Sequence, residues 1–202
     1  MPGPTANGRA AHHGIEEMFL TRWSPRAFTG EAIPEDVLMA LFEAARWAPS
    51  AFNLQPWRFV YARRGEAHWQ RLFDVLIDYN KAWVVNASAL IFVVSDRFRP
   101  RGGRPPEPIY SHSFDAGAAW GYLALQAHRL GWAAHGMTGF DPAKGYAAMG
   151  IDAAEYRIEA AIAVGRIADK SVLPESLQAR ESPSQREPVA KFVFEGRFSA
   201  PQ

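Results

Sequence analysis

Two arginines and a serine that could bind phosphate lie close together near the beginning of this 202-residue chain. Arg22 and Arg26 flank Ser24 in the pentapeptide Arg22-Trp23-Ser24-Pro25-Arg26. Guanidinium groups bind phosphate through charge-assisted, bidentate hydrogen bonds, and a hydroxyl group can add another. A solvated charged turn can have the same composition, so the pentapeptide alone leaves both interpretations open.

A second polar segment lies between a helical pattern and a strand pattern. Residues 48–57 read A-P-S-A-F-N-L-Q-P-W and combine two prolines with Ser50, Asn53 and Gln55. Amide side chains both donate and accept hydrogen bonds, as the edge of a heteroaromatic ring such as the pyrimidine of a flavin requires. In a loop bounded by prolines, such side chains also commonly satisfy the backbone of the loop itself. The segment alone fits either role.

Arg186 and His135 are further candidates for chemistry. Arg186, in the tripeptide R-E-P near the C-terminus, is a third guanidinium that alone indicates no function. His135 could donate a proton to a reduced product, although a lone histidine near an apolar helix is more often satisfied in the core. Four arginines at residues 97–104 could bind an acidic group such as the 2′-phosphate of NADPH, or simply form a charged surface loop.

The composition excludes several classes of function. The absence of cysteine excludes disulfides, thiolate zinc sites, iron–sulfur clusters and a cysteine nucleophile. The net charge of +1 provides no general attraction to nucleic acid or to an anionic membrane. Adjacent His12 and His13 have no fixed geometry, so we expect no metal site. Residues 1–16 lack an apolar signal segment, so we expect a flexible leader, then a single domain over 17–202, in a cytoplasmic protein.

The predicted helices and strands that position these residues do not alternate in a regular βαβ repeat. Helical spacing predicts helices over residues 34–48, 69–77, 114–130 and 142–149. Apolar, β-favouring runs predict strands over 58–62, 87–95, 132–137, 156–167 and 191–195, and a long loop rich in proline and glycine is predicted over 97–110. No G-x-G-x-x-G follows a strand, so a Rossmann domain is not expected. We predict an α+β fold in which helices flank a mostly antiparallel sheet.

The order of these motifs resembles that of the nitroreductase family over nearly the whole chain. The Arg/Ser/Arg turn precedes a helix, A-P-S-x-x-N-x-Q-P-W, D-x-G-x-A from Asp115, G-W-x-x-H-x-x-x-G-F-D at residues 131–141 and a late R-x-P. The A-P-S-x-x-N-x-Q-P-W segment is the most specific of these motifs. The resemblance implies a nitroreductase-like, intertwined homodimer with FMN in each of two sites at the interface.

The resemblance also implies which residues hold the cofactor. Arg22, Ser24, Arg26 and Arg186 would hold the ribityl phosphate and the polar end of the flavin, with Trp23 in the same turn. Pro49, Ser50, Ala51 and Asn53 would approach the isoalloxazine of the other subunit, with Gln55 as loop support or a weaker contact. Asn80 matches a family asparagine on the cofactor, and Thr138 and Gly139 match a segment near the flavin N5.

Trp83 replaces a basic residue that in some relatives faces the N1 and O2 edge of the flavin. This leaves Arg26 as the nearest candidate to stabilise the reduced, anionic flavin. Tyr110, His112 and Phe114, with Trp83, are expected to line an acceptor pocket, although aromatic packing beneath a loop is an equal alternative. A helix from Pro34 to Trp47 spans about 21 Å at about 1.5 Å per residue, so clusters at its two ends reach one ligand most simply from two chains.

The resemblance implies a ping-pong reaction. NAD(P)H would reduce FMN at N5, and a small acceptor such as a nitroaromatic or a quinone would then take up the hydride. The flavin carries the hydride, so no side-chain nucleophile is required, and His135 is the candidate proton donor. Alternatives are another flavin reaction, such as reductive dehalogenation, enoate or fragmentation chemistry, and a non-catalytic FMN carrier. The sequence does not distinguish NADH from NADPH.

Overall fold

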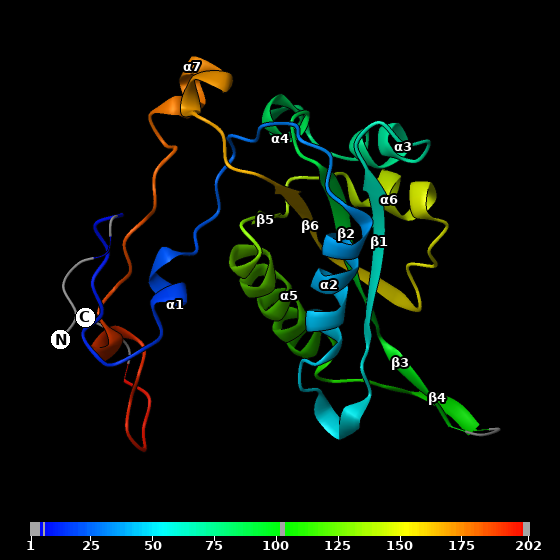
Figure 1. The fold of residues 1–202 in the computed structure, drawn as a ribbon. Coiled ribbons are helices and arrows are strands. Elements are labelled where there is room, and N and C mark those ends of the chain that lie inside the picture. Colours follow the sequence, from blue (N-terminus) through cyan, green and yellow to red (C-terminus); the bar gives the residue numbers. More distant parts are fainter. Residues whose placement is uncertain (1–4, 6, 102–103, 200–202) are drawn as a thin grey trace.

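The computed structural model describes residues 5, 7–101 and 104–199, and its centre is a four-stranded sheet (Figure 1). The strands lie in the order β1-β2-β6-β5, with the bounds Trp57–Arg63 (β1), Ala89–Asp96 (β2), Tyr156–Gly165 (β6) and Ala133–Met137 (β5). Every neighbouring pair is antiparallel, which confirms the predicted α+β class. Each strand also falls on a run that the sequence predicted.

Helices cover both faces of this sheet. One face carries α2 (Glu35–Arg46) and α5 (His112–Arg129), and the other carries α3 (Trp69–Phe73), α4 (Asp78–Val84) and α6 (Pro142–Met149). The side chains of β2 alternate between two cores, because Ile91 packs with α2 and α5 whereas Leu90 and Phe92 pack on the opposite side. In the described part of the chain, none of the helices combines the length and the apolar character that a membrane crossing requires.

The two ends of the chain run beside each other, away from the sheet (Figure 1). Near the N-terminus lies α1 (Glu17–Thr21), and after β6 follow η2 (Lys170–Val172), α7 (Glu175–Gln178) and η3 (Val189–Lys191). Arg9 joins the two ends by donating a hydrogen bond to the carbonyl oxygen of Ser184. The flexible leader over residues 1–16 stays a prediction, and residues 1–4 and 6 of it lie outside the described residues.

The predicted loop over residues 97–110 is instead a β-hairpin. β3 (Phe98–Arg101) pairs antiparallel with β4 (Arg104–Pro108), and residues 102 and 103 between them lie outside the described residues. The prediction was wrong because prolines are compatible with an isolated two-stranded ribbon, whose outer edges need no ladder hydrogen bonds. The hairpin is a separate sheet from the central one (Figure 1).

Two other predicted elements differ from the structure. The strand predicted over 191–195 is absent, because the short helix η3 ends at Lys191 and the chain then turns, with no strand pairing over these described residues. The helical pattern over 69–77 ends early, at Phe73, because Leu76 forms a β-bridge with Phe140 and the backbone N–H of Ile77 donates to Gly139. A new helix, α4, then begins at Asp78.

Candidate functional site

The arginines that the sequence singled out meet in one cavity of about 380 Å³, called here the arginine cavity. The segment before α2, strand β5 and the C-terminal segment together form its wall. The lining residues are Arg9, Arg22, Trp23, Ser24, Arg26, His135, Arg180, Ser182, Ser184 and Arg186. Arg186 is thereby placed beside Arg22 and Arg26 although it lies far from them in the chain, as the phosphate-site interpretation requires.

Glu181 and His135 position the first arginine segment. One carboxylate oxygen of Glu181, Oε1, accepts hydrogen bonds from the backbone N–H groups of Arg26 (2.7 Å) and Ala27 (2.8 Å). On the other side, His135 Nδ1 on β5 lies 2.9 Å from the carbonyl oxygen of Pro25 and donates to it. The extended segment is therefore fixed between the C-terminal segment and the sheet.

The charges of the arginine cavity are not balanced by the protein. Among the described residues, the one ion pair made by its arginines is a long contact of 3.9 Å between Arg26 Nη1 and Glu181 Oε2. The buried Nε of Arg26 has no hydrogen-bond partner, and neither has the buried Oε2 of Glu181 that faces this guanidinium. Burial, followed by the charges of Arg186 and Arg9, lowers the pKa of the Arg22 guanidinium. An unpaired buried donor among mutually repelling cations is what a site for a multiply charged anion needs.

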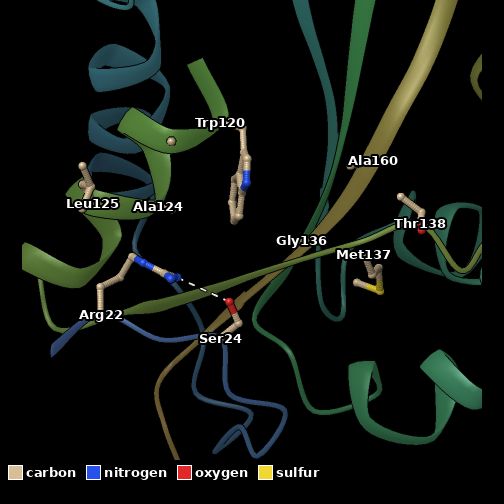
Figure 2. Close-up of a pocket in the computed structure, with 10 residues that line it drawn as sticks. Arg22, Ser24, Trp120, Ala124, Leu125, Gly136, Met137, Thr138 and Ala160 are labelled. Atoms are coloured by element: carbon tan, nitrogen blue, oxygen red, sulfur yellow. Dashed lines mark hydrogen bonds between the residues drawn. The ribbon is translucent and has the colours of Figure 1, made fainter. Parts of the chain in front are cut away.

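A larger cavity of about 570 Å³ adjoins the arginine cavity and shares Arg22 and Ser24 with it. We call it the α5–β5 cavity, and Figure 2 shows Arg22 bonded to Ser24 at one side, with Trp120 projecting from α5. Its other lining residues are Gly121, Ala124, Leu125, Gly136, Met137, Thr138 and Ala160. Its volume lies within the range of sites for organic cofactors.

Asn80 holds the backbone at Thr138 and Gly139, and Thr138 lines the α5–β5 cavity. Asn80 is buried, and its Nδ2 donates to the carbonyl oxygen of Gly139 (2.8 Å) while its Oδ1 accepts from the indole of Trp83 (3.3 Å). A side chain at Gly139 would collide with this amide. Asn80, Thr138 and Gly139 thus lie in one region, and Asn80 sets the path of the backbone there.

Trp83 lies in the core and not on a pocket wall. Its side chain is 1% exposed and packs against Phe28 and His135, with ring centroids 6.2 Å and 4.7 Å away. The expected place in an acceptor pocket is therefore wrong for the single chain, because this large ring fills space between α4 and the sheet.

His135 faces the arginine cavity. Burial lowers the pKa of the His135 imidazole, and the hydrogen bond to Pro25 opposes this shift only in part. The imidazole is therefore neutral near pH 7, and a catalytic role for it stays a prediction.

The segment at residues 49–55 follows the C-terminal end of α2, whereas residues 22–26 precede the N-terminal end of this helix (Figure 1). Asp115 at the start of α5 holds it by accepting from the backbone N–H of Ala51 (3.2 Å). Ser50 Oγ accepts from the backbone of Gln55 (3.0 Å), and Gln55 Nε2 donates to the carbonyl oxygen of Asn53 (3.0 Å), so both support the loop. None of the described residues 49–55 lines the arginine cavity or the α5–β5 cavity.

This loop has an unusual backbone. Phe52, Asn53 and Gln55 all have positive φ, between 50° and 55°, although none of them is glycine. Such residues are uncommon, and several together in one short loop usually mark a functional site. The side chain of Phe52 is 89% exposed, so the strained loop directs an aromatic ring outward.

Tyr110 and Phe114 also face outward, with Tyr110 fully exposed and Phe114 82% exposed. His112 between them is half-buried, and its Nδ1 lies 2.8 Å from Ser95 Oγ, which donates to Glu159 Oε1 (2.7 Å). Glu159 is the extra residue at an irregularity in the β2–β6 register, and such bulges redirect a side chain. Tyr110, His112 and Phe114 therefore stay candidates for an acceptor site only if another chain encloses them.

The described arginines of the hairpin are already engaged. Arg97 donates to the carbonyl oxygens of Ala153 and Ala154, each at 3.2 Å. Arg99 pairs with Glu107 at 2.5 Å. These contacts favour a structural role over recognition of a nucleotide phosphate, and the side chains of Arg101 and Arg104 lie outside the described part of the chain.

Sequence reasoning missed several residues of the arginine cavity. Arg9, Arg180, Ser182 and Ser184 all line it. Arg9 lies in the segment that was expected to be a flexible leader, and its contact with Ser184 spans most of the chain. No periodicity or motif around Arg9 signals this contact, so only the tertiary structure reveals it.

Comparisons with known proteins identify the family of this chain. The model of the nitroreductase family matches residues 20–166. An NADH dehydrogenase of Thermus thermophilus is 29% identical over 202 residues, which covers 87% of this chain and 92% of that protein. The crystal structure of an oxidoreductase containing FMN has a TM-score of 0.95 at 43% identity, covering 98% of this chain and all of the other. A nitroreductase family protein of Streptococcus pneumoniae shares the fold, with a TM-score of 0.69 at 22% identity over 89% of this chain and 98% of that one.

Proposed function

Because the chain belongs to the nitroreductase family, we propose that it is an FMN-dependent oxidoreductase that transfers hydride from NADH or NADPH to a small organic acceptor. The observation that carries the proposal is the arginine cavity, where arginines from both ends of the chain gather and, among the described residues, only Arg26 has a carboxylate partner, Glu181. The similar solved structure is of an oxidoreductase containing FMN, which supports this choice of cofactor.

The residues of the two adjoining cavities fit the two parts of FMN. Arg22, Arg26 and Arg186 would bind the phosphate, with Ser24 adding a hydroxyl donor. The shared wall at Arg22 and Ser24 leads into the α5–β5 cavity, where the ring would lie. The mutual repulsion of Arg9, Arg22 and Arg186 supports this assignment, since an anionic ligand would offset it.

When bound, FMN would supply the hydride-transfer chemistry between the nicotinamide and the acceptor. The protein's part is to position the ring and set the charge around it. Asn80 would hold the segment at Thr138 and Gly139 along one edge, and Trp120 and Gly136 would limit the cavity on the α5 side. Arg22 lines both cavities whereas Arg26 lines only the arginine cavity. Arg22 is therefore better placed than Arg26, the candidate from sequence, to stabilise negative charge on the reduced ring.

A homodimer would complete the site. α5 carries Gly117 and Gly121 on a face where an added Cβ at either position would meet nothing within 4 Å. Phe114 and Tyr122 on the same helix are exposed. Close approach of a second α5 would explain both the glycines and the exposed rings. It would also bring the outward-facing loop at residues 49–55 of one chain to the cavities of the other.

Titration of the purified protein with FMN tests this function. We expect about one FMN per chain, with the yellow absorbance of a bound flavin, and rapid bleaching in stopped flow when NADH or NADPH is added. Reoxidation by a panel of nitroaromatic, quinone and halogenated acceptors would then identify the reaction class. A protein that binds FMN but keeps it oxidised with both nucleotides would be a carrier, and a protein that binds no FMN would refute the proposal altogether.

A further inference from the structure

Arg9 is a buried arginine that neither the family resemblance nor the sequence assigns to a site. Arg9 is 6% exposed. The Nε atom donates to the carbonyl oxygen of Ser184 (2.8 Å), and Nη1 donates to the carbonyl oxygens of Arg22 (2.9 Å) and Leu20 (3.1 Å). One guanidinium thereby joins the N-terminal leader, the end of α1 and the C-terminal segment.

A compact turn presents Arg9 in this position. The backbone N–H of Gly8 donates to the carbonyl oxygen of Thr5 (2.8 Å), and the Thr5 hydroxyl donates to the carbonyl oxygen of Arg9 (2.9 Å). Asn7 anchors the turn, because its Nδ2 donates to the carbonyl oxygen of Leu20 (3.0 Å). The contact between Arg9 and the arginine cavity is thus built by several side chains of the leader.

The buried charge of Arg9 has no counter-ion in the part of the chain that the structure describes. Among the described residues it forms no ion pair, and the acceptors of its Nε and Nη1 groups are neutral carbonyl oxygens. Burial, followed by the charge of Arg186, lowers the pKa of the Arg9 guanidinium. Arg9 also lines the arginine cavity together with Arg22 and Arg186. A buried cation beside two others is unfavourable unless an anion offsets the repulsion.

We propose that Arg9 couples phosphate binding to the docking of both chain ends, so that residues 7–16 and the segment at residues 182–188 close over the arginine cavity when a phosphomonoester occupies it. This inference rests on the proposed FMN site, whose phosphate is the phosphomonoester. Arg9 acts as a positioning residue, because its donors hold the backbone of Arg22 and Ser184 and its charge adds to the field at the phosphate. Without the anion, repulsion among Arg9, Arg22 and Arg186 favours release of the two ends.

The coupling makes a prediction that needs no variant. In phosphate-free buffer, hydrogen exchange of the wild-type apoprotein would be followed alone, with FMN and with riboflavin, which has the same ring but no phosphate. We expect FMN to slow exchange at residues 7–24 and 182–188, and riboflavin at saturating concentration to leave these segments at their apoprotein rates. Equal protection by both ligands, or slow exchange in both segments without ligand, would overturn the proposal.

The variants Arg9→Gln and Arg9→Lys test the residue itself, with Arg71→Gln on an exposed face of α3 as the matched control. For Arg9→Gln we expect roughly tenfold weaker FMN binding, unchanged riboflavin binding and no FMN-dependent protection of residues 182–188. Arg9→Lys keeps the charge but not the planar donors, and we expect it to restore part of the FMN affinity without the protection.

The outcomes separate this inference from the proposed function. Wild-type protein that fails to bind FMN would end the proposed function. Wild-type protein that binds FMN, with an Arg9→Gln variant that keeps both the affinity and the protection, would refute only the role of Arg9. Should Arg9→Gln fail to fold, the comparison of FMN with riboflavin on the wild-type protein still tests the closure, and Arg9→Lys, which keeps the charge, tests the role of Arg9: FMN-dependent protection of residues 182–188 in that variant would refute it.

Discussion

Replacing Arg186 by alanine should weaken FMN binding without weakening the fold. Arg186 is exposed, and its Nη1 donates hydrogen bonds within its own segment, to Ser184 Oγ (2.8 Å), to the carbonyl oxygen of Ser184 (3.3 Å) and to that of Gln185 (3.0 Å). Its charge lowers the pKa of both Arg22 and Arg9, so it repels them in the protein without ligand. Arg186→Ala removes this repulsion, and the unfolding free energy of the apoprotein should change by less than about 1 kcal/mol.

The loss of phosphate binding should be much larger than the change in stability. A charge-assisted hydrogen bond contributes about 1.5–3 kcal/mol, which corresponds to roughly 10- to 150-fold in affinity. Since Arg186 is exposed to solvent screening, we expect the lower end, roughly tenfold. Arg186 lines the arginine cavity but not the α5–β5 cavity, so riboflavin affinity should not change. Fluorescence titration of wild type, Arg186→Ala and the control Arg71→Ala with FMN and riboflavin measures this, and an unchanged ratio of the two affinities would refute the reasoning.

Three further substitutions test other parts of the structure. A Cβ at Gly139 would lie 2.9 Å from Ile77 Cδ1 and collide with the Asn80 amide, so Gly139→Ala should lower stability by about 1–3 kcal/mol and weaken FMN binding; denaturation with urea checks the first, and unchanged stability would contradict the close packing. Gly117→Leu adds a side chain where the single chain has open space, so circular dichroism should show a folded subunit while sedimentation velocity shows weaker dimerisation. The control is Ala143→Leu, at an exposed position of α6, and a Gly117→Leu protein that dimerises as well as this control and the wild type would argue against pairing through α5. The pKa of His135 is lowered by burial, so the unfolded chain takes up its proton first; its stabilising contribution is complete above about pH 6.5 and is lost as the pH falls below that value. His135→Gln should therefore lose less stability than wild type between about pH 7.5 and 5.5, and equal losses would show that His135 does not cause this dependence.

Sequence predicts a helix most accurately when local residues mark where it begins and ends. The helix predicted over residues 142–149 has those bounds in the structure. Asp141 caps it by accepting from the backbone N–H of Lys144 (3.1 Å), Pro142 occupies the first turn, and Gly150 ends it with a left-handed φ of 66°. The buried strand β2 was equally visible, because a continuous apolar run needs both faces covered.

Features that depend on distant contacts were not visible in the sequence. The apolar run at 191–195 resembles a strand, but no neighbouring strand pairs with it over the described residues. Trp83 was expected to face a ligand, and its burial depends on Phe28 and His135, which come from other parts of the chain. The convergence of Arg22, Arg26 and Arg186 was inferred from the family resemblance, whereas Arg9 was missed because its contact depends on the docking of both chain ends.

A crystal structure of the protein with FMN tests the central claim most directly. We expect the phosphate in the arginine cavity, within hydrogen-bond distance of Arg22, Ser24 and Arg186, and the ring in the α5–β5 cavity beneath the loop at residues 49–55 of a second chain. A phosphate bound elsewhere, or a ring that no second chain contacts, would contradict it.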